Sequence, residues 1–155
     1  MQMRGVLALG ESVTTRELWA RLFQSPSIDS YFSGNSDACE MPKFSEYITQ
    51  LCESRNEKPA WVINRAEIER SFGHRLFTGV RNPSRDTVLQ LAFGFGLSTD
   101  ETQQLLKVAR MTPLHPKVKR DAVIAYGLHL GENVVWAQLM LYDHGLPLLG
   151  GKRNV

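Results

Sequence analysis

The chain has 155 residues, a formal net charge of +2 and 43% hydrophobic residues, which is ordinary globular composition and enough chain to bury a core. No apolar run reaches the length of a membrane span and the apolar start is too short for a signal peptide, so we expect a cytoplasmic protein without a membrane partner. Cys39 and Cys52 form no CxxC pair and the four histidines have no metal-binding spacing. We therefore expect reduced thiols, no metal site and no cofactor.

Residues 1–36 are predicted to be an N-terminal extension with one or two helices. Residues 1–13 carry weak signals, compatible with a short strand or a disordered start. Thr14 and Glu17 have the spacing of a capping box. The helix that follows carries four apolar residues on one face: Leu18, Trp19, Leu22 and Phe23. A segment rich in Ser, Gly and Asn then places a boundary at about residue 36.

Five helices joined by short turns are predicted within residues 42–111. The first has apolar residues at i, i+3, i+4 and i+7, namely Phe44, Tyr47, Ile48 and Leu51. The second begins at Pro59 and is expected to bury Trp61, Val62, Ile63 and Ala66. The third is a short basic helix over about 70–77 that ends at Gly79. The last two are expected to begin after Ser84 and after a second capping box, Ser98 with Glu101.

Two further helices, over about 117–130 and 132–144, are predicted to form a hairpin within residues 116–149. The last helix is apolar nearly all round, so it either packs on the same core or pairs with a second copy of the chain. No strand pattern occurs beyond the first few residues. The predicted fold class is all-α.

The second and third helices of residues 42–111 are separated only by the Glu-Ile-Glu of residues 67–69. Two short helices with so short a turn are typical of the helix-turn-helix unit, whose second helix lies in the major groove of DNA. Between Arg55 and Arg85 there are seven basic and three acidic residues. The positive charge of the chain is therefore concentrated in this unit, as binding to phosphates requires.

The segment VINRAEIERSFGHRLFTGVRNPSRDTVLQLAFGFGLSTDETQQLL resembles the lambda-repressor-like, XRE-family helix-turn-helix domain. The most similar piece is LFTGVRNPSRDTVLQLA, in which a glycine closes the recognition helix and an Asn-Pro turn leads into the fourth helix. The resemblance covers residues 44–109. It implies a five-helix domain, flanked here by the N-terminal extension and the C-terminal hairpin. It also implies a sequence-specific transcriptional regulator that binds double-stranded DNA. A homodimer is one option, because such repressors usually bind paired half-sites.

The resemblance also implies roles for particular residues. Base edges would be read by the third helix, through Arg70 and Ser71 in its first turn and His74 and Arg75 one turn later. Phosphates or the minor groove would be contacted by four residues that flank the helix pair: Lys58, Arg81, Asn82 and Arg85. The structural alternative is that the arginines only solvate a helix face.

Three positions depart from the family pattern. Ile63 and Glu67 stand where the family often has alanine and glycine, and Gly73 stands where it usually has a β-branched core residue. Glycine in a helix costs about 1 kcal/mol of propensity. Gly73 therefore either permits close packing or makes the third helix less rigid.

No P-loop, GxGxxG, HExxH or GxSxG motif occurs, so we expect a binding protein and not an enzyme. The alternative function is a protein-interaction adaptor that keeps the helix-turn-helix fold without specific DNA binding. Glu67 and Glu69 favour this alternative because they would face phosphates. Salt dependence distinguishes the two, since DNA binding weakens steeply as salt rises.

Overall fold

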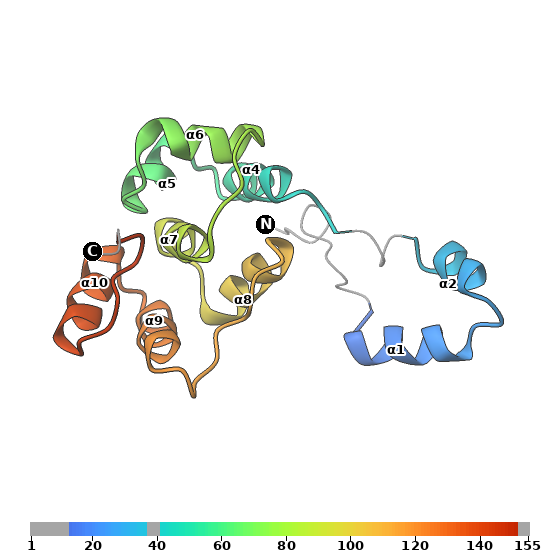
Figure 1. Ribbon diagram of the computed structural model, residues 1–155. Helices are drawn as coiled ribbons and strands as arrows, with labels where there is room; N and C mark the ends of the chain where they lie inside the picture. The colour runs from blue at the N-terminus through green and yellow to red at the C-terminus, as the bar shows by residue number, and fades with distance from the viewer. Residues whose placement is uncertain (1–12, 37–40, 152–155) are drawn as a thin grey trace. The chain divides into compact units, whose positions relative to one another are not determined.

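The computed structural model describes residues 13–36 and 41–151, and all regular secondary structure in these residues is α-helical (Figure 1). This confirms the all-α fold class. No helix in these two ranges is long and apolar enough to cross a membrane. The chain divides into two compact units, Met1–Lys43 and Phe44–Val155. The expectations for residues 1–12 and for Cys39 lie outside the described residues.

The N-terminal unit contains α1 (Thr15–Gln24) and α2 (Ile28–Gly34). The capping box is confirmed, since Thr14 Oγ1 accepts from the Glu17 amide at 3.1 Å and Glu17 Oε1 accepts from the Thr14 amide at 3.0 Å. Trp19 and Phe23 stack with ring centroids 5.5 Å apart. Neither helix buries a side chain. The predicted apolar face of α1 is thus formed but not buried, since Trp19 and Phe23 are exposed and Leu18 and Leu22 are half-buried.

The second unit is built around α7 (Arg85–Phe95), in which every residue from Thr87 to Phe95 is buried. In the view of Figure 1, α4 (Phe44–Ser54), α5 (Pro59–Arg65) and α6 (Arg70–Thr78) lie above α7. Three helices lie below it: α8 (Thr99–Val108), α9 (Lys119–Leu130) and α10 (Val134–Asp143). Because α7 is covered from both sides, it fixes where the surrounding helices sit.

The helix ends follow the predicted local signals. Ser84 accepts from the Thr87 amide at the start of α7, and Ser98 forms the predicted capping box with Glu101 at the start of α8. Gly79 closes α6 with φ of 84°, a left-handed conformation that glycine adopts without steric cost. These caps keep the helices short and the connections tight.

Trp61 corrects one expectation, because 49% of it is exposed whereas Val62, Ile63 and Ala66 are buried. Successive residues of an α-helix are about 100° apart, so a run of three neighbouring apolar residues cannot all face one side. Val62 and Ile63 lie on the buried face of α5, and Trp61 lies outside that face. The side chain is exposed on the outer surface of α5.

The last helix, α10, buries Val134, Ala137 and Leu141 and packs on α9 and α7. Its other side exposes Val135, Leu139 and Tyr142. The helix thus joins the core of its own unit through one face only, although its sequence is apolar nearly all round.

Two crossed arginine–aspartate pairs join α7 to α9. Arg85 donates to both oxygens of Asp121 at 3.0 Å, and Arg120 donates to both oxygens of Asp86 at 2.9 Å. Burial alone would raise the pKa of Asp86, but hydrogen bonds from Arg120 and the Gly150 amide, with nearby arginine charge, hold it below its usual value. The same Arg-Asp dipeptide, at the start of each helix, forms both pairs.

Candidate nucleic-acid interface

The turn between α5 and α6 is held in place by α7. Glu67 has a φ of 58°, so it takes the left-handed conformation that glycine adopts most readily. The buried side chain of Gln90 donates to the carbonyl oxygens of Ala66 at 3.1 Å and Glu67 at 3.4 Å. These bonds satisfy turn carbonyls that would otherwise lack partners. The turn therefore forms with a non-glycine residue at a conformational cost.

Gly73 permits close packing of α5 against α6, which decides between the two alternatives left by the sequence. A Cβ at position 73 would lie 2.6 Å from Cγ2 and 2.8 Å from Cγ1 of Ile63. Ile63 is buried, and both helices are fixed by the core. Ile63 on α5 thus fills the space that a side chain at position 73 of α6 would otherwise occupy. Ile63 and Gly73 are both positions at which the sequence departs from the pattern of the family that it resembles, and the two departures compensate each other.

A second glycine brings α7 equally close to α5. A Cβ at position 94 would lie 2.7 Å from the carbonyl oxygen of Val62 and 2.9 Å from Cβ of Ala66. Arg65 then reaches across and donates from Nε to the Gly94 carbonyl at 2.9 Å. One tight approach therefore joins α6 to α5, and the other seats α5 on α7.

The start of α6 is capped by an acidic side chain. Glu69 accepts from the amides of Phe72 at 2.8 Å and Ser71 at 2.9 Å. These bonds hold the pKa of the Glu69 carboxyl below its usual value, so it is ionised at neutral pH. A negative charge stabilises the positive end of a helix dipole. The same charge occupies amides that could otherwise bind a phosphate.

The predicted base-reading residues share the outer side of α6. Gly73 and Leu76 are buried, while Arg70, Ser71 and Arg75 are exposed and His74 is half-buried. Residues three and four apart share a helix face. The face that carries Ser71, His74 and Arg75 therefore also carries the exposed Thr78, which the sequence analysis missed although helical spacing identifies it.

The predicted phosphate-binding residues differ in how exposed they are and in whether the protein itself binds them. Lys58 is exposed at the N-terminus of α5, with its ammonium 5.5 Å from the centre of the Trp61 ring. Arg81 and Asn82 are exposed in the turn that follows α6. Within the described ranges, the guanidinium of Arg81 forms no ion pair or hydrogen bond, and the same holds for Arg70 and Arg75.

Arg85 was expected to contact phosphate or the minor groove, but it is bound within the protein. Besides Asp121, it donates to the carbonyl oxygens of Thr112 at 2.9 Å and Pro113 at 3.1 Å. Four of its five N–H donors are thus used inside the protein. A partner 36 residues away in the chain, which sequence spacing does not reveal, makes this arginine part of the fold and not a free phosphate contact.

The positive charge available to a ligand is smaller than the sequence count indicates. Arg55 pairs with Glu101, and Arg65 pairs with Glu57, at 3.1 and 2.8 Å. With Arg85 also paired, four cations between residues 55 and 85 remain unpaired in the described part of the chain: Lys58, Arg70, Arg75 and Arg81. They come from α5, from α6 and from the turn after it.

Two other functional chemistries have little support in this unit. Cys52 is buried, and burial, with the nearby charge of Glu57, raises the pKa of its thiol to about 11, so the reactive thiolate is scarce at neutral pH. No group of three or more His, Cys, Asp or Glu side chains in the described residues is arranged to hold a metal ion.

Comparison with known proteins adds no relative. No protein-family model matches the chain, and neither curated proteins nor solved structures give a significant match.

Proposed function

We propose that this chain is a sequence-specific, DNA-binding transcriptional regulator of the lambda-repressor-like, XRE-family type. In this proposal, α4 to α8 form the five-helix DNA-binding domain and α6 enters the major groove. The main support is that α6 packs through Gly73 and Leu76 and presents Ser71, His74 and Arg75 on its outer side. These side chains are types that donate to or accept from base edges.

In the proposal, the unpaired cations bind DNA, some at base edges and others at phosphates. Arg70 and Arg75 have free guanidinium groups that can donate two parallel hydrogen bonds to O6 and N7 of guanine. Lys58 and Arg81 would neutralise phosphates on either side of α6, with Asn82 as a neutral backbone contact. Binding as a two-fold dimer to paired half-sites would double these contacts.

The experiment is a fluorescence-anisotropy titration of a duplex selected by the protein from a random pool. Arg70→Ala and Arg75→Ala should each weaken binding to that duplex by about 1–3 kcal/mol and relax the preference for one base pair. Arg81→Ala should weaken binding to all duplexes alike and lower the salt slope by about 1. Arg16→Ala, an exposed arginine of α1, is the matched control. Unchanged affinity in both α6 variants would refute α6 as the reading helix.

The alternative of a protein-interaction adaptor has its own supporting observations. Trp61 on α5 and Val80 after α6 are 49% and 70% exposed, and Glu69 adds negative charge at the start of α6. Apolar binding to a protein would depend little on salt, whereas DNA binding loses affinity steeply between low and moderate salt. Trp61→Ala should abolish such protein binding.

A further inference from the structure

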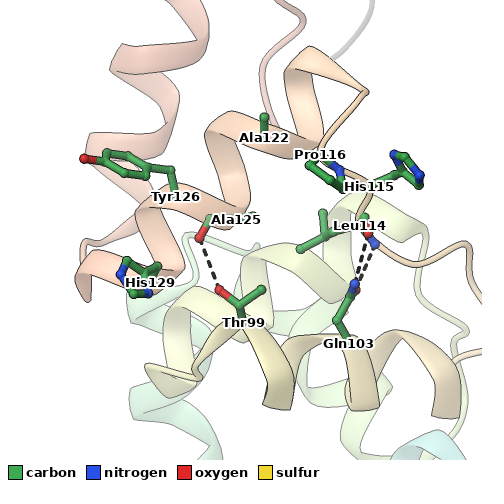
Figure 2. A pocket seen from close by; sticks show the side chains of 9 residues that line it. All are labelled: Thr99, Gln103, Leu114, His115, Pro116, Ala122, Ala125, Tyr126 and His129. Atoms are coloured by element: carbon green, nitrogen blue, oxygen red, sulfur yellow. Dashed lines mark hydrogen bonds between the residues drawn. The ribbon is translucent and has the colours of Figure 1, made fainter.

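A pocket of about 420 Å³ lies between α8, α9 and the connection between them. This volume falls within the range of sites for small molecules. Much of the lining is apolar and small: Leu114, Pro116, Ala122 and Ala125. Figure 2 shows the lining residues, with His115 and His129 at opposite ends. The alanines of α9 leave space that larger side chains would fill.

The walls of the pocket are held in place without a ligand. Gln103 on α8 donates to the carbonyl oxygen of Leu114 at 2.9 Å and accepts from its amide at 2.8 Å (Figure 2). Asp121 accepts from the amide of His115 at 3.0 Å. Thr99 donates to the carbonyl oxygen of Ala125 at 3.3 Å. Because the walls are already ordered, a ligand would bind with little loss of conformational entropy.

The polar groups of the lining that keep hydrogen-bonding capacity can each donate a hydrogen bond. His115 Nδ1 accepts from the Lys117 amide at 3.0 Å, so in the neutral ring the proton lies on Nε2, which is free to donate. Within the described residues, the Tyr126 hydroxyl and the His129 imidazole form no hydrogen bond. No carboxylate of the described residues lines the pocket. This set of groups favours a ligand with an anionic oxygen.

The aromatic surface at the edge of the pocket favours a flat ligand body. Tyr126 is 59% exposed and lies beside Trp136, with ring centroids 6.5 Å apart. An aromatic ligand could pack on this ring and on the apolar wall while its acid group reaches an imidazole. We propose that the pocket binds a small aromatic carboxylate and that the bound ligand alters DNA binding.

The route from pocket to DNA runs through the connection between α8 and α9. Arg85 binds the carbonyl oxygens of Thr112 and Pro113 in that connection, and Asp121 binds both Arg85 and the amide of His115. Arg85 is also the first residue of α7, directly after the turn that carries Arg81. A ligand bound against the connection is thereby linked to the start of α7 through these hydrogen bonds. This regulatory part rests on the proposed DNA-binding function, whereas the ligand site does not.

The test uses 2-naphthoate as the probe and the histidine ring protons as the readout in NMR. The chain has four histidines, two in the lining and two elsewhere, His74 and His144. We expect saturable ring-current shifts of His115 and His129 only, with half-saturation below about 1 mM for a ligand of roughly 13 heavy atoms. The uncharged analogue 2-naphthalenemethanol should bind about tenfold more weakly.

Variants separate the pocket from other apolar surface. Ala122→Phe should fill the pocket and abolish the shifts, while Ala20→Phe, on exposed α1, should leave them intact. Tyr126→Phe, which removes only a hydroxyl, should weaken binding without affecting the fold. Missing shifts, equal shifts of all four histidines, or shifts that persist in Ala122→Phe would overturn the ligand site.

The regulatory part is tested separately with DNA. Saturating 2-naphthoate should change the affinity for the selected duplex by about fivefold or more, and Ala122→Phe should remove this effect. Unchanged affinity would overturn the coupling while the NMR result stands. If the protein binds no duplex at all, the proposed function and its regulation fail together, and the histidine shifts still decide the ligand site.

Discussion

The contact between Ile63 and Gly73 can be tested by a double-mutant cycle. In Gly73→Ala, the added Cβ lies 2.6 Å from Cγ2 of Ile63, far below the normal carbon–carbon separation of about 3.5–4.0 Å. Overpacking of this kind costs about 1–3 kcal/mol, against about 1 kcal/mol gained in helix propensity. We therefore expect Gly73→Ala alone to lower the free energy of unfolding by up to about 2 kcal/mol.

The same substitution should have the opposite sign when Ile63 is shortened. Ile63→Ala alone should cost about 2–5 kcal/mol, because it removes a buried side chain. In that background the Cβ at position 73 has room, so Gly73→Ala should now raise the free energy of unfolding by about 1 kcal/mol. The difference between the two backgrounds is the coupling energy of the pair, about 1–3 kcal/mol.

The assay is urea unfolding of the four proteins, with equal m-values as the check that all unfold alike. Gly94→Ala is the matched control, since its Cβ would meet the backbone carbonyl of Val62 at 2.7 Å and shortening Ile63 cannot relieve that contact. It should stay destabilising in both backgrounds. An effect of Gly73→Ala that is the same in both backgrounds, within about 0.5 kcal/mol, would refute the compensation.

Three further predictions concern stability. Glu67→Gly should raise the free energy of unfolding by about 1 kcal/mol in urea, because glycine takes a φ of 58° without steric cost; a loss would contradict the strained turn. Arg85→Ala should cost about 3 kcal/mol by leaving the buried Asp121 carboxylate without its main partner, while Arg81→Ala should change stability by less than about 0.5 kcal/mol; equal effects would contradict the distinction between them. The folded-state pKa of Asp86 lies below the unfolded value, so its stabilisation is present above about pH 4 and is lost as the pH falls through the folded pKa. Asp86→Asn should flatten the loss of stability that urea midpoints record between about pH 5 and pH 2, and an identical profile would argue against this role.

The sequence predicts those parts of the fold that depend on near neighbours in the chain. The capping boxes at Thr14 and Ser98 and the left-handed Gly79 need only residues three or four positions away, and all three form as expected. Helical spacing likewise places Tyr47 and Leu51 on the buried side of α4. Local hydrogen bonds and helical periodicity are sufficient for such features.

Features that depend on residues far apart in the chain could not be predicted from the sequence. The large side chain of Ile63 fits only because Gly73, ten residues later on another helix, has no side chain. Arg85 looks like a phosphate contact until Asp121 is seen to hold it. The exposure of Trp61 depends on which side of a seven-residue helix meets α7. In each case tertiary packing, which sequence spacing does not encode directly, decides the outcome.

The candidate DNA-binding face combines both kinds of information. Helical spacing alone places His74 and Arg75 with Ser71 on one side of α6, and the structure leaves that side uncovered within the second unit. Which cations are free to meet phosphates follows only from the ion pairs. The resemblance supplied the roles of these residues, and they remain predictions.

The most direct test of DNA reading by α6 is selection from a random duplex pool at moderate salt, run in parallel with the wild-type protein and Arg75→Ala. We predict that the wild type enriches a short motif, in two half-sites if the protein dimerises, and that Arg75→Ala loses the preference at one base pair of each half-site while the rest of the motif persists. Failure of the wild type to enrich any motif would contradict sequence-specific reading by α6.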